Sequence, residues 1–168
     1  AGLGVSGPKD GGSDQVKVSA DAKLVYETAA LEADLTISGH PVVRAWVSAS
    51  ASDVDVYANL EDIAQDGKAT SYHMDGRLRA SHRQEATAPY DNLGLPWRTH
   101  LEKDVMPLTP GEPAELAFDL FPISYRFAAG HRLRLTLTFG DPMDASPNVS
   151  VHRSPENASH LVLPVVEK

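Results

Sequence analysis

The chain has 168 residues, a formal net charge of −8 and no cysteine. This length suits one domain, which buries roughly 70% of its unfolded surface. The missing cysteines exclude disulfides, thiolate metal sites and a cysteine nucleophile. The acidic charge disfavours nucleic-acid binding, which needs a basic surface. No apolar run approaches the ~20 residues that a membrane-spanning helix requires.

The first residues are rich in glycine and serine and show no periodicity. We expect an irregular arm or linker over residues 1–15 and one folded domain over residues 16–168. Residues 2–7 match the G-x-G-x-x-G pattern, but that motif needs a strand before it and a helix after it. Neither is indicated here, so no cofactor loop is expected. No signal peptide is visible, and the chain begins with Ala1, so we expect a processed product or a part of something longer, whose compartment stays open.

Apolar residues alternate with polar ones in several short segments, a period that is typical of half-buried β-strands. The first segments are residues 24–26, 33–38, 43–50 and 53–61, with a stop at Gly39, His40 and Pro41. Further along, residues 116–120, 149–151 and 161–166 are strand candidates. No segment of more than ten residues shows convincing helical periodicity.

Two segments between these strands carry turn signals. Asp75 and Gly76 form a pair that favours a tight hairpin, so residues 72–74 and 77–79 are predicted as its two strands. Residues 121–127 are interpreted as a bend or a single helical turn before Gly130.

The best-defined strand covers residues 131–139. Leu133, Leu135, Leu137 and Phe139 share one face, and burying each would contribute roughly 1.5–3 kcal/mol as an upper value. We expect this strand at the centre of a sheet. The many short strands and frequent turns predict an all-β fold, a sandwich or a jelly roll.

Residues 88–113 are rich in proline, glycine and aromatic side chains and are predicted as a long surface loop, with a short strand near residues 102–106. Tyr90 and Trp97 lie in this loop. An aromatic side chain in a surface loop either anchors the loop on its own domain or docks on a partner. The sequence weighs these two roles equally, and both residues are candidate partner contacts.

A search for chemistry finds no catalytic constellation. The chain has no G-x-S-x-G elbow of an α/β-hydrolase and no H-E-x-x-H zinc motif, so no catalytic, metal or cofactor residues are predicted. Asp53 and Asp55 share a strand face, and a solvated face is a better interpretation than an acid/base pair. His131 falls on the inward face of the main strand, where a hydrogen-bonded core histidine is expected more often than a ligand.

Three arginines, Arg77, Arg79 and Arg83, cluster near the predicted hairpin. Guanidinium groups bind anions and partner carboxylates, so Arg79 and Arg83 are further candidate partner contacts. The alternative is that these side chains face water or pair with neighbours such as Asp75 and Glu85.

Several strings of residues together resemble one family. They are residues 24–28, 31–39, 47–50, 53–56, 60–67, 75–83, 110–113, 122–135, 152–154 and 159–164. In this order they resemble the C-terminal, non-catalytic domain of the cocaine esterase and Xaa-Pro dipeptidyl-peptidase serine hydrolases.

This resemblance implies a jelly-roll β-sandwich of the galactose-binding-like class. It also implies an accessory role: the domain packs on a catalytic α/β-hydrolase domain, whether on the same chain or a separate one, and helps to shape its substrate pocket. The family's catalytic serine, aspartate and histidine lie in that other domain, so none is assigned to this chain.

Two alternatives to the accessory role remain open. A free-standing carbohydrate-binding module would use Trp46, Tyr90 and Trp97 to stack on sugars, although fold analogy alone supports this weakly. A pure interaction or assembly domain without a ligand is the other, and a homo-oligomer would be one form of it.

Overall fold

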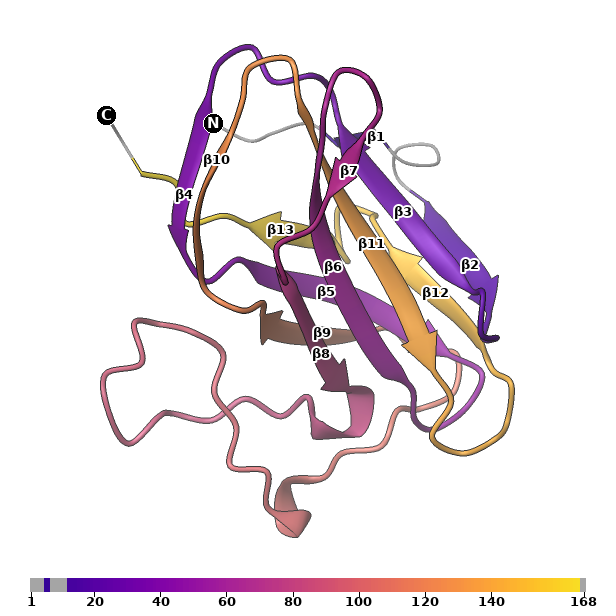
Figure 1. Cartoon of the computed structure of the whole chain (residues 1–168). Coiled ribbons are helices and arrows are strands. Elements are labelled where there is room, and N and C mark those ends of the chain that lie inside the picture. The colour runs from indigo at the N-terminus through magenta and orange to yellow at the C-terminus, as the bar shows by residue number, and fades with distance from the viewer. Residues whose placement is uncertain (1–4, 7–11, 167–168) are drawn as a thin grey trace.

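The computed structural model describes residues 5–6 and 12–166, and it is nearly all β (Figure 1). The strands form two main sheets and a small third one. The six-stranded sheet holds β1 (Val5–Ser6), β3 (Lys23–Thr28), β6 (Asp55–Ile63), β7 (Ala69–Thr70), β8 (Asp75–Arg79) and β11 (Arg132–Gly140). The five-stranded sheet holds β2 (Ser13–Lys17), β5 (Val42–Ala49), β9 (Ala114–Asp119), β12 (Asn148–His152) and β13 (His160–Val162). The third sheet pairs β4 (Leu35–Gly39) with β10 (Ile123–Phe127).

The strand predicted at the centre of a sheet lies there. β11 pairs antiparallel with β3 on one side and with β6 along nine residues on the other. The two main sheets stack with their apolar faces inward, as in a β-sandwich (Figure 1). Fully buried side chains from both sheets and from the small sheet meet in one core; they include Ile37, Val47, Leu60, Leu116, Phe127 and Leu137. The prediction of an all-β sandwich is therefore confirmed.

The predicted hairpin at Asp75 and Gly76 is wrong. Both residues lie inside the single strand β8, which pairs with β6. Gly76 is needed there for close packing, because a Cβ atom on it would lie 2.4 Å from the backbone oxygen of Asp119 and 2.9 Å from Leu120 Cδ2. A glycine inside a strand marks such a close approach of another backbone.

Two other local predictions are also wrong. Residues 121–127 form no bend: β10 is a full strand, paired with β4 from Ile123 opposite Gly39 to Phe127 opposite Leu35. Near residues 102–106 the structure has a 3₁₀ turn, Glu102–Asp104, in place of a strand. A lone strand in a surface loop has no neighbour to accept its backbone hydrogen bonds, so the chain closes them locally.

The expected arm over residues 1–15 needs a correction at its end. β2 begins at Ser13 and pairs along its length with β12, so residues 13–15 belong to the folded sandwich. Val5 and Ser6 pair with the end of β3. The rest of the G-x-G-x-x-G match, Gly2, Leu3, Gly4 and Gly7, lies outside the described residues.

The long loop, residues 83–113, leaves β8 after a second 3₁₀ turn, Ala80–His82, and returns to β9. Figure 1 shows it in pink, extending from one end of the sandwich. Leu108 is buried in the core and its N–H donates to the carbonyl of Ser52 at 2.7 Å, which fixes the returning part of the loop. The middle of the loop is exposed.

We expect Gly76→Ala to destabilise the fold by about 1–3 kcal/mol, because the added methyl group overlaps the backbone of Asp119. Urea unfolding followed by circular dichroism measures the change. Arg77→Ala, at the exposed next position of the same strand, is the matched control and should stay within about 0.5 kcal/mol of wild type. Equal stabilities of the two variants would contradict the close-packing role of Gly76.

Candidate functional site: an apolar cleft between the sheets

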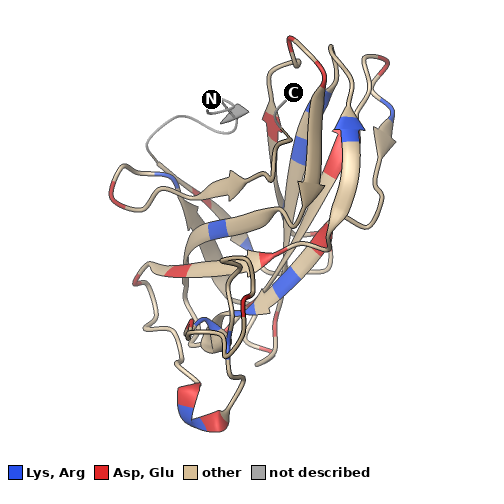
Figure 2. Cartoon of the chain, turned by 90° about the vertical axis from the view of Figure 1, so that its left-hand side faces the viewer, with Lys and Arg blue, Asp and Glu red and all other residues tan. Residues whose placement is uncertain are grey.

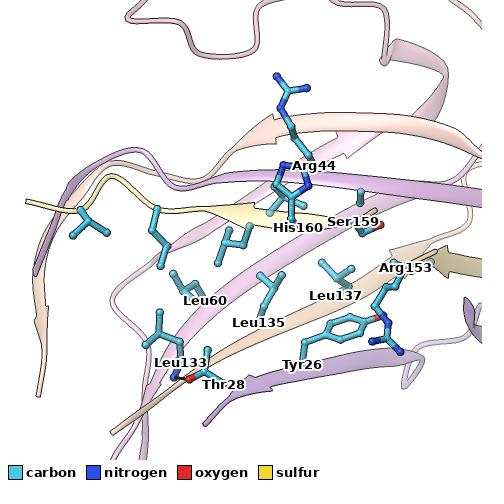
Figure 3. A pocket seen from close by; sticks show the side chains of 16 residues that line it. Tyr26, Thr28, Arg44, Leu60, Leu133, Leu135, Leu137, Arg153, Ser159 and His160 are labelled. Carbon is cyan, nitrogen blue, oxygen red and sulfur yellow. Dashed lines mark hydrogen bonds between the residues drawn. The ribbon is translucent and has the colours of Figure 1, made fainter. Parts of the chain in front are cut away.

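An apolar cleft opens between the two main sheets. Its volume is about 510 Å³, within the range of roughly 300–1,000 Å³ that is typical of ligand pockets. The lining comes from β3, β5, β6, β11, β12, β13 and the segments that flank β13. Figure 3 shows Leu133, Leu135 and Leu137 along β11, with Leu60 of β6 beside them.

The cleft exists because the second sheet covers the inner face of β11 only in part. Leu133 and Leu137 are buried, whereas Leu135 between them is only half-buried. Leu135 lies opposite Leu60 on one neighbouring strand and Tyr26 on the other, so it sits in the middle of the sheet. An incompletely covered leucine at this position indicates apolar surface left for another group to cover.

One end of the cleft is closed by a buried polar cluster. Asp14 on β2 accepts hydrogen bonds from Tyr26 Oη and from Arg153 Nε, each at 3.0 Å. The Arg153 guanidinium lies 5.8 Å from the centre of the Tyr26 ring. Burial, and next the charge of Asp14, raise the pKa of Tyr26 far above its usual range, so the phenol stays protonated and donates. The cluster joins β2 and β3 of different sheets.

A second carboxylate network lies at the start of β11. Asp62, which is only 4% exposed, accepts hydrogen bonds from His131 Nδ1 at 2.8 Å and from Tyr125 Oη at 2.7 Å. Burial and the bond to Asp62 raise the pKa of Tyr125 well above its usual range. The hydrogen-bonded role predicted for His131 is confirmed, although the histidine is half-buried. The network ties β10 to the six-stranded sheet.

Sequence reasoning missed a serine–histidine contact. Ser48 Oγ of β5 lies 2.8 Å from His152 Nε2 of β12. Ser48 is buried, and burial lowers the pKa of His152. Among the described residues no carboxylate is hydrogen-bonded to His152, so the pair lacks the third group of a catalytic triad. Ser48 lies opposite Ser150 in the ladder, so His152 is two residues further along β12. The alternation within one strand does not predict a contact between two strands.

The arginines predicted as partner contacts are largely engaged within the domain. Arg79 binds Asp55 through two hydrogen bonds of 2.8 and 3.1 Å. Arg83 donates to the carbonyls of Ala80, Met106 and Pro107, and so holds the returning part of the long loop. Burial lowers the pKa of Arg83. The expected pairing with Asp75 or Glu85 is therefore replaced by Asp55 and by backbone carbonyls.

The two loop aromatics differ in their exposure. Tyr90 is 61% exposed and Trp97 is half-buried. Beside Trp97, Arg98 reaches under the loop and donates to the carbonyl of Ala117 in β9. Its Nε is buried without a hydrogen-bond partner, and burial lowers its pKa. Arg98 is an anchor of the loop that no sequence pattern singled out.

The outer face of the six-stranded sheet is charged but balanced. Arg132 binds Glu27 at 2.7 Å, and Arg134 binds Glu61 at 2.8 Å. Figure 2 shows positive and negative positions interspersed over the strands, with no large region of one sign. Exposed pairs of this kind contribute about 0–1 kcal/mol each. Asp53 and Asp55 do not share a solvated strand face: Asp55 begins β6 and pairs with Arg79, whereas Asp53 precedes the strand and accepts from the N–H and Oγ of Ser81.

Over the part of the chain that the structure describes, no group of three histidine, aspartate or glutamate side chains could hold a metal ion. No helix in the same residues has the length and apolar character needed to cross a membrane.

The chain matches one family model over nearly its whole length. The family model of the X-Pro dipeptidyl-peptidase C-terminal non-catalytic domain matches residues 6–164. The chain belongs to this family. The resemblance seen in the sequence is thereby confirmed, and the family's own description calls this domain non-catalytic.

Similar proteins place this X-Pro dipeptidyl-peptidase C-terminal domain within larger chains. A Mycobacterium bovis protein that carries the name of a serine esterase is 38% identical over 156 residues, which are 88% of this chain and 24% of that protein. The cocaine esterase of a Rhodococcus species is 28% identical over 167 residues, 88% of this chain and 26% of that protein. The chain thus spans about a quarter of the length of these curated relatives.

Solved structures agree on the fold. A CocE/NonD family hydrolase from Staphylococcus aureus has a TM-score of 0.76 at 17% identity, covering 95% of this chain and 34% of that one. An α-amino acid ester hydrolase has a TM-score of 0.68 at 22% identity, covering 86% of this chain and 25% of that one. In these proteins the matched domain is one part of a larger hydrolase chain.

His152 makes the stability of the domain depend on pH. Because burial lowers its folded-state pKa below the ordinary value of 6.5, the unfolded chain takes up the proton first as the pH falls. The free energy of unfolding should therefore drop as the pH is lowered through about 6.5. The variant His152→Gln should flatten this part of the profile, measured by urea unfolding at pH 5.5 to 8.

His73→Gln is the matched control for this test, because the His73 side chain is 97% exposed. It should leave the slope of wild type unchanged. An unchanged slope in the His152→Gln variant would contradict the assignment.

Proposed function

We propose that this domain packs on the catalytic α/β-hydrolase domain of a serine hydrolase and helps to shape its substrate pocket. The observation that carries the proposal is the match of residues 6–164 to a non-catalytic domain that forms only about a quarter of its hydrolase relatives. The names of these relatives suggest that the whole enzyme cleaves esters. X-Pro dipeptidyl-peptidase activity is the other possibility that the family name carries.

The exposed middle of the long loop supports a docking role. Large apolar side chains gather there: Leu93 is 83% exposed, Tyr90 61%, Leu101 51% and Met106 43%. A series of such side chains on one loop is typical of a protein-interaction surface. Arg83 joins the start of the loop to its returning part at Pro107, and Arg98 fixes the middle of the loop to Ala117 of β9, so the surface is presented on a fixed base.

Within this proposal the four predicted contact residues have different roles. Tyr90 presents an exposed ring and would contact the catalytic domain directly. Trp97, half-buried, would position the loop and reach the partner with its remaining surface. Arg79 and Arg83, bound to Asp55 and to loop carbonyls, would act by holding the β8 end and the loop in place.

Neither alternative function gains support from the comparisons. The family and the relatives are hydrolases, and none of the matched names describes a carbohydrate-binding module or a free-standing interaction domain. The comparisons do not support the expected homo-oligomer either.

The proposal is tested with the catalytic part of the hydrolase produced as a separate polypeptide. Mixed with the 168-residue chain, it should form a complex that elutes as one peak in size-exclusion chromatography. The double variant Tyr90→Ala/Leu93→Ser should bind at least tenfold more weakly, because truncating interface anchors costs about 1–2 kcal/mol each. Separate elution of the two wild-type parts would contradict the proposal.

Lys68→Ala is the control for the double variant, because Lys68 lies in the exposed turn between β6 and β7. The chain alone should not hydrolyse p-nitrophenyl esters or Xaa-Pro amides. In the complex, Trp97→Ala should change the KM ratio between a bulky and a small acyl ester. An unchanged ratio would limit the role of the domain to packing.

A further inference from the structure

The mouth of the apolar cleft is bordered by the edges of two sheets. In the described residues β13 lies at the end of the five-stranded sheet and pairs only with β5. Across the mouth, β3 pairs with β11 on one side, and on its other side β1 reaches only Glu27 and Thr28. The cleft lies between β13 and the inward side chains of β3, Tyr26 and Thr28.

The backbone of β13 has hydrogen-bonding groups that point toward this mouth. In an antiparallel ladder, alternate residues bond to the same neighbour. Directly after β5, Ser50 donates to the carbonyl of Asn148, so the even-numbered residues of β5 face β12 and β13. His160 and Val162 lie opposite Arg44 and Val42 and face β5 in turn, which leaves the N–H and C=O of Leu161 pointing away.

No backbone hydrogen bond outside the ladders uses Leu161 in the part of the chain described here. Free N–H and C=O groups on a sheet edge are a template for another strand.

The side chains beside this edge alternate as a strand partner requires. Leu161, Leu163 and Val165 line the cleft, whereas Val162 between them does not and is 47% exposed. Figure 3 shows the strand of His160 facing the leucines of β11 across the cleft. The cleft thus has the unpaired backbone groups of Leu161 on one side and an apolar surface, centred on Leu135, on the other.

We propose that an extended segment from the rest of the hydrolase polypeptide pairs with β13 and covers the cleft. Its apolar side chains, at every second position, would rest on Leu135, and its backbone would bond to Leu161. A small apolar ligand would cover the leucines but leave the Leu161 N–H and C=O unpaired, whereas a strand satisfies both. The source of the segment rests on the proposed function, because relatives carry about three times as much chain outside this domain.

A tethered strand tests the capacity of this edge in the 168-residue chain. An alternating valine–threonine segment of about eight residues is joined to the C-terminus by a flexible glycine–serine linker of about 15 residues, which gives a millimolar effective concentration. Hydrogen exchange of the Leu161 amide is then followed by NMR. We expect it to slow at least tenfold relative to a matched fusion whose segment carries two central prolines, because proline cannot complete a ladder.

The amides of β2 serve as the internal control, because β2 belongs to the same sheet but pairs with β12 and not with β13. Their exchange should be the same in both fusions. Equal exchange of Leu161 in the two fusions, or slowing at β2 instead, would overturn the proposal. Decanoate added to the unfused chain gives a further arm: methyl shifts at Leu135 without any effect of the tethered strand would indicate a small-molecule site and would also overturn it.

The tethered-strand experiment tests the pairing with β13, and the complex formation experiment tests the proposed function, so either result can be negative without the other. Slow exchange of Leu161 without formation of a complex would refute the proposed function and leave the edge competent for another segment. Formation of a complex without an effect of the tethered strand would refute the pairing and leave the loop as the docking surface.

Discussion

The structure depends on covering the inner face of β11. This face carries Leu133, Leu135, Leu137 and Phe139, and removing them from water stabilises the fold. β3 and β6 flank the strand, and β5 and β12 cover most of the face. The cover is incomplete at Leu135, and the apolar cleft between the two main sheets opens there. The need for cover thus explains both the sandwich and the place where it stays open.

The buried polar side chains of this sandwich connect its strands, and we assign them no catalytic role. Asp14 joins β2 to β3 through Tyr26, and Asp62 joins the small sheet to β6 through Tyr125. Each carboxylate is nearly fully buried and accepts two hydrogen bonds, which is what a buried charge requires. A tyrosine whose pKa is raised and a histidine bound to aspartate suggest an active site in isolation. Here the same groups hold strands in register, in agreement with a family that is non-catalytic.

Periodicity predicted the strands that have one wet and one dry face, because there the sequence itself alternates. β11, β5 and β6 are of this kind. Periodicity gave wrong predictions where a glycine or a proline has a role other than forming a turn. Gly76 leaves room for the backbone of Asp119, and Pro122 precedes a strand without interrupting it. The signal for β10 was available in the alternation of Ile123, Tyr125 and Phe127, but the adjacent proline masked it.

The candidate sites were less predictable than the fold for a physical reason. The cleft, the Ser48–His152 contact and the free edge of β13 each arise from segments more than a hundred residues apart, or from strands of different sheets. No local pattern encodes such a meeting. Family resemblance supplied the accessory role, whereas the anchoring of the loop by Arg98 and the opening beside Leu135 needed the assembled sandwich.

The central claim is that this domain is an incomplete sandwich that the rest of its hydrolase chain completes. Hydrogen exchange measured by mass spectrometry on residues 159–166, in the isolated chain and in the full-length hydrolase, tests it most directly. The account predicts slower exchange of these residues in the full-length enzyme, with the buried strand β6 unchanged. Equal exchange of residues 159–166 in the two proteins would contradict it.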